Sequence, residues 1–121
     1  MKTKSQVEQL VEALLNSWSI KSSSKWSMEN PARGQCGVTA LVVHDILGGE
    51  IRKTPLPEGW HYYNVIHNVR YDLTQSQFEE TIIYEDVHSN RQEAFMDTNM
   101  DQYNYLKTSV LKLLRNSQFQ P

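Results

Sequence analysis

Three residues of the sequence have the types that nucleophilic thiol catalysis requires. Cys36 is the single cysteine of the 121-residue chain, and His61 and Asp72 follow it in that order. A cysteine attacks as the thiolate, a histidine can take the thiol proton, and a carboxylate can fix the tautomer and orientation of the imidazole. We therefore take Cys36 as the candidate nucleophile, His61 as the candidate base and Asp72 as the residue that orients the base.

The residues around Cys36 predict that the thiol lies at the start of a central helix. Gly34 and Gln35 precede it, and residues 38–47 are apolar on nearly every face. The pair Gly48-Gly49 then ends the pattern, as is typical of a helix C-terminus. The unpaired N–H groups and the dipole at a helix start favour negative charge, so we expect a lowered thiol pKa and donors for an oxyanion.

His61 and Asp72 fall on two runs with β-strand character, residues 61–66 and 69–73, separated by His67-Asn68. With a two-residue turn, side-chain alternation makes His61 and Asp72 diagonal neighbours on one face, with Cβ atoms roughly 7 Å apart. A three-residue turn would place them on opposite faces. The other face carries a set of apolar and aromatic residues that we expect to face the core: Tyr62, Ile66, Val69, Tyr71 and Leu73.

The remaining patterns predict an α+β fold in a single domain over residues 1–121. Ser5 and Asn99 are expected to cap the first and last helices. The predicted elements are a helix over 6–18, a loop over 19–33, a strand over 50–52, a rigid loop with Pro55, Pro57 and Gly59, a helical turn over 74–78, a strand or extended loop over 82–87, a helix over 89–95, and a last helix with Tyr103, Leu106, Val110, Leu113 and Leu114 on its inner stripe.

Composition and spacing narrow the classes of function. The net charge of −2 offers no basic face for nucleic acid, and no apolar run approaches the roughly 20 residues that span a bilayer. A single cysteine excludes an intramolecular disulfide and is typical of a reducing compartment, so we expect a cytoplasmic protein. No histidine pair has metal-ligand spacing, and we predict neither a metal nor a cofactor.

Several motifs together resemble the YunG-like family of small bacterial proteins. They are residues 34–43, 48–51, 61–64, 72–78 and 89–95, and the resemblance extends from Trp18 to Leu106. These motifs are in turn similar to papain-like and transglutaminase-like cores, in which a Cys at a helix start meets a His and an Asp or Asn on adjacent strands. The resemblance implies a papain-like core in which the Cys-bearing helix packs on a small antiparallel sheet, flanked by the N- and C-terminal helices. The spacing of 25 residues from Cys36 to His61 is too short for the two-lobed cleft of papain itself.

The same resemblance suggests supporting residues. Papain-like enzymes place an amide side chain six residues before the cysteine as an oxyanion donor, which makes Asn30 the first candidate and Gln35 the second. Asn30 is equally suited to capping a turn before Pro31. Four further residues are candidates for the pocket, namely Trp26, Trp60, Gln77 and Arg91.

Each of these four pocket candidates also has a structural interpretation, which we favour. The two tryptophans would pack in the core, and Gln77 would bond to Thr74 at the start of the helical turn. Arg91 would pair with Glu93 or Asp97.

These observations predict a thiol-dependent acyl-transfer enzyme, either an amide or peptide hydrolase or an amidotransferase-like enzyme, that acts on a small-molecule or peptide substrate. Two alternatives stay open. The chain is also compatible with a non-catalytic binding module that keeps the fold and uses its six tyrosines and three tryptophans for recognition. It is equally compatible with a part of a larger assembly, such as a homodimer in which the apolar stripe of the last helix forms the contact.

Overall fold

The computed structural model describes residues 5–117 of the chain. In this range it has four α-helices, four strands and one 3-10 turn. In chain order they are α1 (Gln6–Leu15), α2 (Cys36–Leu47), β1 (Glu50–Leu56), β2 (Gly59–Ile66), β3 (Val69–Tyr71), η1 (Gln75–Gln77), β4 (Val87–His88), α3 (Arg91–Phe95) and α4 (Met100–Asn116).

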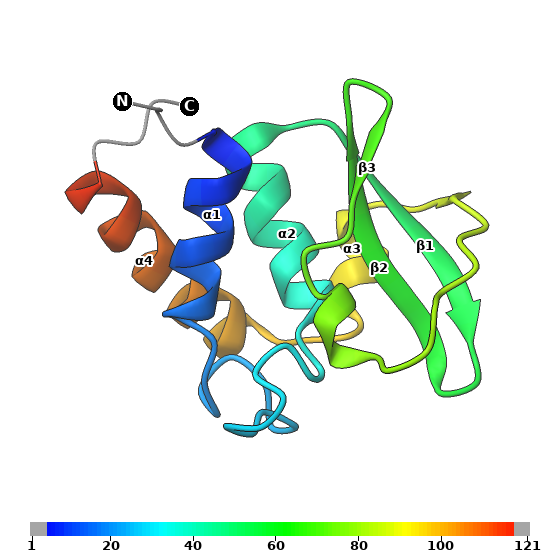
Figure 1. The fold of residues 1–121 in the computed structure, drawn as a ribbon, viewed down its shortest axis with the longest axis horizontal. Coiled ribbons are helices and arrows are strands. Elements are labelled where there is room, and N and C mark those ends of the chain that lie inside the picture. The colour runs from blue at the N-terminus through cyan, green and yellow to red at the C-terminus, as the bar shows by residue number, and fades with distance from the viewer. Residues whose placement is uncertain (1–4, 118–121) are drawn as a thin grey trace.

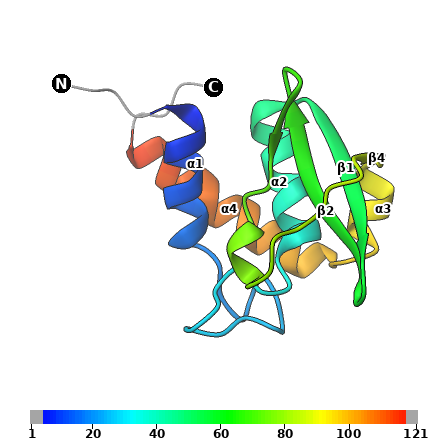
Figure 2. The same ribbon diagram turned by 45° about the vertical axis from the view of Figure 1, so that its right-hand side comes forward.

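The elements form layers, with α2 in the middle. Figure 1 shows α1 and α4 together on one side of α2 and the sheet on the other side. The sheet is antiparallel, and its strand order is β3-β2-β1-β4. Figure 2, which turns the molecule, also shows α2 between the helical layer and the sheet. This arrangement confirms the α+β class and the prediction that the Cys-bearing helix packs on a small antiparallel sheet.

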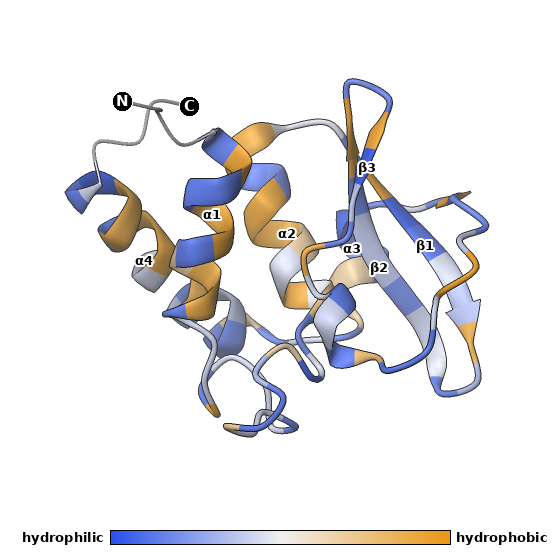
Figure 3. Cartoon of the chain, viewed as in Figure 1, coloured by the Kyte–Doolittle hydropathy of each residue, from blue (hydrophilic) through white to orange (hydrophobic). Residues whose placement is uncertain are grey.

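Helix α2 forms the centre of the core because it is apolar on nearly every face. Every residue from Cys36 to Val43 is buried. Figure 3 shows apolar residues along α2 and on parts of α1 and α4, while β1 and β2 are largely polar or neutral. Two polar bonds also fix the helix in place: Trp18 Nε1 donates to Thr39 Oγ1 at 3.0 Å, and Asn64 Nδ2 donates to the Ala40 carbonyl at 3.1 Å.

The predicted stripe of α4 packs inside the chain. Leu106, Val110 and Leu114 are buried, and α4 contacts both α1 and α2. These side chains are therefore not exposed to form the dimer face that the sequence left open. Among residues 5–117, no helix combines the length and apolar character needed to cross a membrane.

The β2–β3 hairpin has the predicted two-residue turn. His67 and Asn68 have φ angles of 50° and 64°, as the favoured hairpin turn with two left-handed residues requires. Ile66 pairs with Val69, so the register is the one that alternation needs. Tyr62 and Ile66 contact the core as expected, with Tyr71 and Leu73 packed beside them, but Val69 is exposed.

Several predicted boundaries were wrong. Helix α1 ends at Leu15, with Asn16 as its C-cap, rather than at residue 18. Strand β1 extends through Pro55 to Leu56 instead of ending at 52, because β4 pairs only with Arg52 and Lys53 and leaves Pro55 on a free edge. Strand β4 comprises only two residues at the end of the extended segment.

Candidate active site

Cys36 is the first residue of α2, as predicted, and a tight approach of the preceding loop fixes its position. Gly34 has a φ angle of 73°, which favours glycine, and a Cβ there would lie 2.4 Å from Ser23 Oγ and 2.9 Å from Lys25 Cβ. The Ser23 hydroxyl also accepts a hydrogen bond from the Lys25 N–H at 3.1 Å. The loop that carries Lys25 is therefore packed directly against the residues that lead into Cys36.

The thiol is bonded to a carboxylate that the sequence did not suggest as a partner. Cys36 Sγ donates to Asp97 Oδ2 at 3.3 Å, and the residue is only 8% exposed. Burial, followed by the negative charge of Asp97, raises the pKa of the Cys36 thiol, while a backbone hydrogen bond from Tyr62 opposes the increase. The expected lowering of this pKa was therefore wrong, because burial and a like charge outweigh the favourable helix terminus.

His61 and Asp72 form the predicted pair. His61 Nε2 lies 2.7 Å from Asp72 Oδ2, and the two side chains are 2% and 3% exposed. Because an ionised carboxylate only accepts, this contact places the imidazole proton on Nε2. The other ring nitrogen, Nδ1, is buried and has no hydrogen-bond partner among the described residues, so its lone pair is available as a base.

The carboxylate of Asp72 is held from both sides. The Tyr84 hydroxyl donates to Oδ2 at 2.7 Å, and the Thr74 N–H and hydroxyl donate to Oδ1 at 3.3 Å. Burial and this bond to Asp72 raise the pKa of the Tyr84 phenol, which therefore stays a donor. Phe78 packs edge-on against the His61 ring at 5.0 Å between ring centroids. The imidazole of His61 and the carboxylate of Asp72 are thus fixed in orientation.

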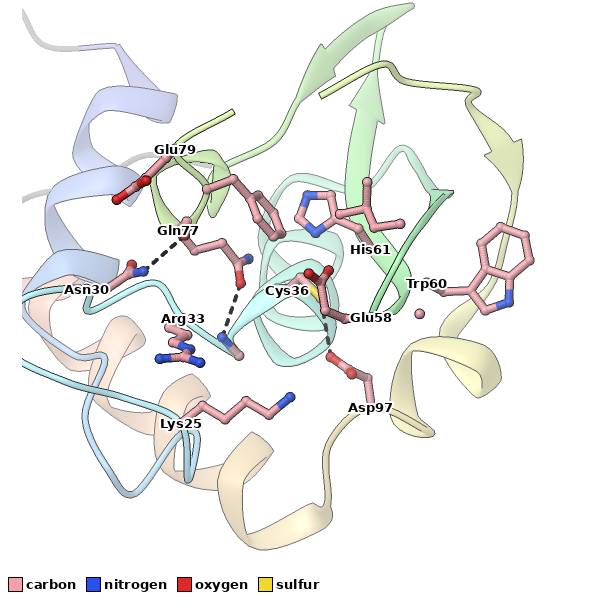
Figure 4. Close-up of a pocket in the computed structure, with 14 residues that line it drawn as sticks. Lys25, Asn30, Arg33, Cys36, Glu58, Trp60, His61, Gln77, Glu79 and Asp97 are labelled. Carbon is pink, nitrogen blue, oxygen red and sulfur yellow. Dashed lines mark hydrogen bonds between the residues drawn. The ribbon is translucent and has the colours of Figure 1, made fainter. Parts of the chain in front are cut away.

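Cys36 and His61 both line a cavity of about 380 Å³ at the start of α2. In this structure the thiol bonds to Asp97 rather than to the imidazole, although the Tyr62 backbone, adjacent to His61, also reaches the thiol. Figure 4 shows the cavity with Lys25 and Arg33 on the side of the long loop and Trp60 on the side of the sheet. The remaining lining residues include Asn30, Glu58, Gln77, Phe78, Glu79 and Asp97.

The two candidate oxyanion donors have other partners. Asn30 lines the cavity, but its Nδ2 donates to the Gln77 carbonyl at 3.0 Å. Gln35 is buried outside the cavity lining, and its Nε2 donates to the Pro31 carbonyl at 3.3 Å. Neither amide group is directed at the thiol by a hydrogen bond, so the backbone N–H groups of α2 are the better placed donors.

Of the four pocket candidates, two line the cavity. Trp60 does so with its ring under Lys53 Nζ at 4.1 Å; it is exposed, so the expectation that it packs in the core was wrong. Gln77 does so while its Nε2 donates to Thr74 Oγ1 at 3.1 Å. Trp26 packs against the core and lies outside the cavity lining. Arg91, the fourth candidate, is treated separately below.

Arg91 also lies outside the cavity lining, so its assignment to the pocket was wrong. Its guanidinium pairs with Asp45 at 3.1 Å and donates to the Leu41 carbonyl at 3.2 Å. Arg91 therefore joins α3 to the C-terminal half of α2. The structural role is confirmed, although its partner is Asp45 rather than Glu93 or Asp97.

Asp97 is the site residue that sequence reasoning missed. It follows α3 on the turn that leads to α4, and its Oδ2 also accepts the Gly37 N–H at 3.0 Å. Partial burial of the carboxyl group raises the pKa of Asp97. No local pattern marks this residue, because the contact joins positions 61 residues apart.

Comparison with known proteins assigns the chain to a family. The profile of the YunG protein family matches residues 6–115. The chain belongs to the YunG family. A member from Bacillus subtilis (strain 168), which bears the name "Uncharacterized protein YunG", is 52% identical over 101 residues, covering 84% of this chain and 88% of the relative. The resemblance inferred from the motifs is confirmed, and Cys36, His61, Asp72 and Asp97 all lie inside the YunG match. No solved structure shows a significant match to the chain.

Proposed function

We propose that this protein is a thiol-dependent acyl-transfer enzyme that uses Cys36 as nucleophile and His61 as base. The observation that carries the proposal is the state of the imidazole. Nε2 is fixed on Asp72, while Nδ1 is buried, has no partner among residues 5–117, and belongs to a ring that lines the same cavity as the thiol. A buried polar atom without a partner needs an explanation, and a base that waits for a proton provides one.

The reaction begins when His61 Nδ1 takes the proton from Cys36 Sγ. The thiolate attacks the carbonyl carbon of an amide or ester, the carbonyl π bond opens, and the oxygen becomes an oxyanion near the N–H groups at the start of α2. When the intermediate collapses, the bond to the leaving group breaks, and His61 returns the proton to the leaving amine or alkoxide. Asp72 keeps the ring in the same tautomer and stabilises the imidazolium.

The second half of the reaction releases the acyl group from sulfur. Water or an amine gives a proton to His61 Nδ1 and bonds to the thioester carbonyl carbon. The carbon–sulfur bond then breaks, and the thiolate recovers the proton from the imidazolium. The product is a carboxylic acid when water attacks and a new amide when an amine attacks.

The arrangement favours this proposal over a chance grouping. A cysteine at a helix start, a histidine on a strand and an aspartate after the next strand follow the order of papain-like and transglutaminase-like cores, and we take a compact papain-like core as part of the proposal. The cavity of about 380 Å³ suits a small molecule or the end of a peptide chain. The polar groups that surround it are compatible with an amide substrate.

The proposal is tested by incubating the protein with p-nitrophenyl acetate and measuring acetylation by intact mass together with release of p-nitrophenolate. We expect a thioester on Cys36 in the wild type and none in Cys36→Ala. In His61→Ala we expect acetylation to be at least about 100-fold slower. His88→Gln is the matched control, because His88 is exposed and forms its ion pair with Glu50, on the sheet and outside the cavity lining. Equal acetylation of wild type and His61→Ala would refute the proposal.

A second candidate function is a binding module without catalysis. It is favoured by the burial of the thiol and its bond to Asp97, which raise the thiol pKa and suit an inert cysteine. On this interpretation p-nitrophenyl acetate would leave no thioester on Cys36 even when Asp97 is replaced. The same mass measurement therefore separates the two functions.

A further inference from the structure

The carboxylate of Asp97 lies where an acyl-transfer enzyme would bind the carbonyl oxygen of its substrate. Oδ2 accepts both the Gly37 N–H, at 3.0 Å, and the Cys36 thiol, at 3.3 Å. A carbonyl oxygen under attack by this sulfur would need a backbone N–H donor at about 2.7–3.1 Å and would lie close to the sulfur itself. Asp97 Oδ2 meets both conditions, so it occupies the position of an oxyanion.

Gly37 permits this close approach. It is a helical residue, where glycine is less favourable than alanine by about 1 kcal/mol, so packing must explain its presence. A Cβ at this position would lie 2.7 Å from Asp97 Oδ2, 2.7 Å from Asp97 Cβ and 2.8 Å from the Ala94 carbonyl. The helix thus has an opening at its second residue, and the Asp97 side chain fills it.

We infer that Asp97 is a positioning residue that holds the resting site closed: its carboxylate takes the place of the substrate's carbonyl oxygen and retains the proton on Cys36 until it is displaced. This inference rests on the proposed function. While Oδ2 is in place, the Gly37 N–H is unavailable to a substrate. Removal of the carboxylate frees the donor and the thiol together.

Lys25 is the cation that can receive the displaced carboxylate. It lines the cavity and makes no ion pair with any residue from 5 to 117, and its charge already favours the ionised form of Asp97. Figure 4 shows its side chain extended across the cavity toward the side where Asp97 lies. The packing of its loop against Gly34 holds it there.

The charge of Asp97 and its position affect different steps. Titratable groups reach the thiol and Asp97 from several elements: Lys25 from the loop, His61 and Tyr62 from β2, and Asp72 after β3. The charged residues Arg33, Glu58 and Glu79 also line the cavity. Of the two carboxylates that raise the thiol pKa, Asp97 is the nearer and has the larger effect. The charge controls the fraction of thiolate, whereas the position controls access of a carbonyl to the Gly37 N–H.

Two substitutions separate these effects. Asp97→Asn removes the charge and keeps the shape, while Asp97→Ala removes both. Loss of a like charge lowers a pKa by roughly one to three units. Because a less basic thiolate is also a weaker nucleophile, the net increase in alkylation rate below the thiol pKa is about threefold per unit, or about 3- to 30-fold.

The experiment measures alkylation of Cys36 by iodoacetamide from pH 6 to 9 and acetylation by p-nitrophenyl acetate at neutral pH. We expect both variants to show faster alkylation throughout this pH range, and only Asp97→Ala to show faster acetylation. Asp101→Asn is the matched control, because Asp101 is an exposed acid in the first turn of α4, outside the cavity lining.

The outcomes distinguish the inference from the function on which it rests. Unchanged or slower alkylation in both variants overturns the inference, and so does a loss of acetylation in Asp97→Ala, which would make Asp97 the base. If Asp97→Ala acetylates faster but the additional change His61→Ala has no effect on that rate, the control of the thiol by Asp97 stands and the role of His61 fails. Faster acetylation that depends on His61 supports both.

Discussion

The substitution Asp72→Asn tests whether Asp72 prepares His61 for its proposed role as the base. Thr74 donates its N–H and hydroxyl to Oδ1 of Asp72, so the asparagine keeps its carbonyl oxygen on that side. Its NH2 group then faces Nε2 of His61 and the Tyr84 hydroxyl. In the wild type, both of these groups donate to the carboxylate at 2.7 Å. Because the NH2 group only donates, His61 must accept at Nε2 and carry its proton on Nδ1.

The size of the effect follows from the two short bonds. A hydrogen bond to a charged group contributes about 1.5–3 kcal/mol and a neutral one about 1 kcal/mol, so weakening two of them costs about 1–4 kcal/mol of stability. This is less than the 5–15 kcal/mol typical of a domain, so the variant should still fold. With Nδ1 protonated, the base is lost, and the acetylation rate of Cys36 should fall about 100- to 10,000-fold.

The assay combines three measurements on one sample. Urea unfolding gives the change in stability, p-nitrophenyl acetate gives the acetylation rate, and long-range proton–nitrogen spectra of labelled protein give the tautomer of each histidine. The signal of His61 is assigned by its absence in His61→Ala. We expect the Nε2–H tautomer in the wild type and the Nδ1–H tautomer in the variant. A folded Asp72→Asn protein that switches tautomer yet acetylates at the wild-type rate would refute the reasoning.

Three further predictions concern stability. Gly37→Ala forces the Asp97 side chain and the Ala94 carbonyl away from α2, since the new Cβ would lie within 2.8 Å of both, and should lower the free energy of unfolding in urea by about 1–3 kcal/mol. Trp18→Phe removes the buried bond to Thr39 and should cost about 1–3 kcal/mol, whereas an unchanged urea midpoint would show that this bond contributes nothing. The pKa of Asp86 is lowered from 3.8 to about 2, chiefly by its hydrogen bond to Arg70. Its contribution to stability is therefore present above pH 4 and is lost as the pH falls toward 2, and Asp86→Asn should flatten this part of the curve of unfolding free energy against pH.

Local patterns in the sequence were sufficient to predict the pair of His61 and Asp72. The turn at His67-Asn68 sets the register, and a two-residue turn leaves one way to align the strands. The helix start at Cys36 was equally evident, because Gly34 precedes it and the apolar run follows it. These features depend on neighbours within about a dozen residues, which is the range over which turn and helix signals act.

The features that the sequence did not predict depend on contacts between distant segments. Asp97 reaches Cys36 from a turn 61 residues away, and Arg91 reaches Asp45 across the interface between α3 and α2. The thiol pKa could not be inferred because the helix terminus lowers it while burial and Asp97 raise it, and only the packed structure determines which effect is larger. The extension of strand β1 through Pro55 could not be predicted for a similar reason, because the free edge at Pro55 exists only once the sheet has formed.

The central claim is that the sulfur of Cys36 and the imidazole of His61 act together. The most direct measurement is the single-turnover rate of Cys36 acetylation by p-nitrophenyl acetate in two proteins, Asp97→Ala and Asp97→Ala combined with His61→Ala. Both lack the carboxylate to which the thiol is hydrogen-bonded. The account predicts that loss of His61 slows acetylation at least about 100-fold in this background. Equal rates in the two proteins would contradict it.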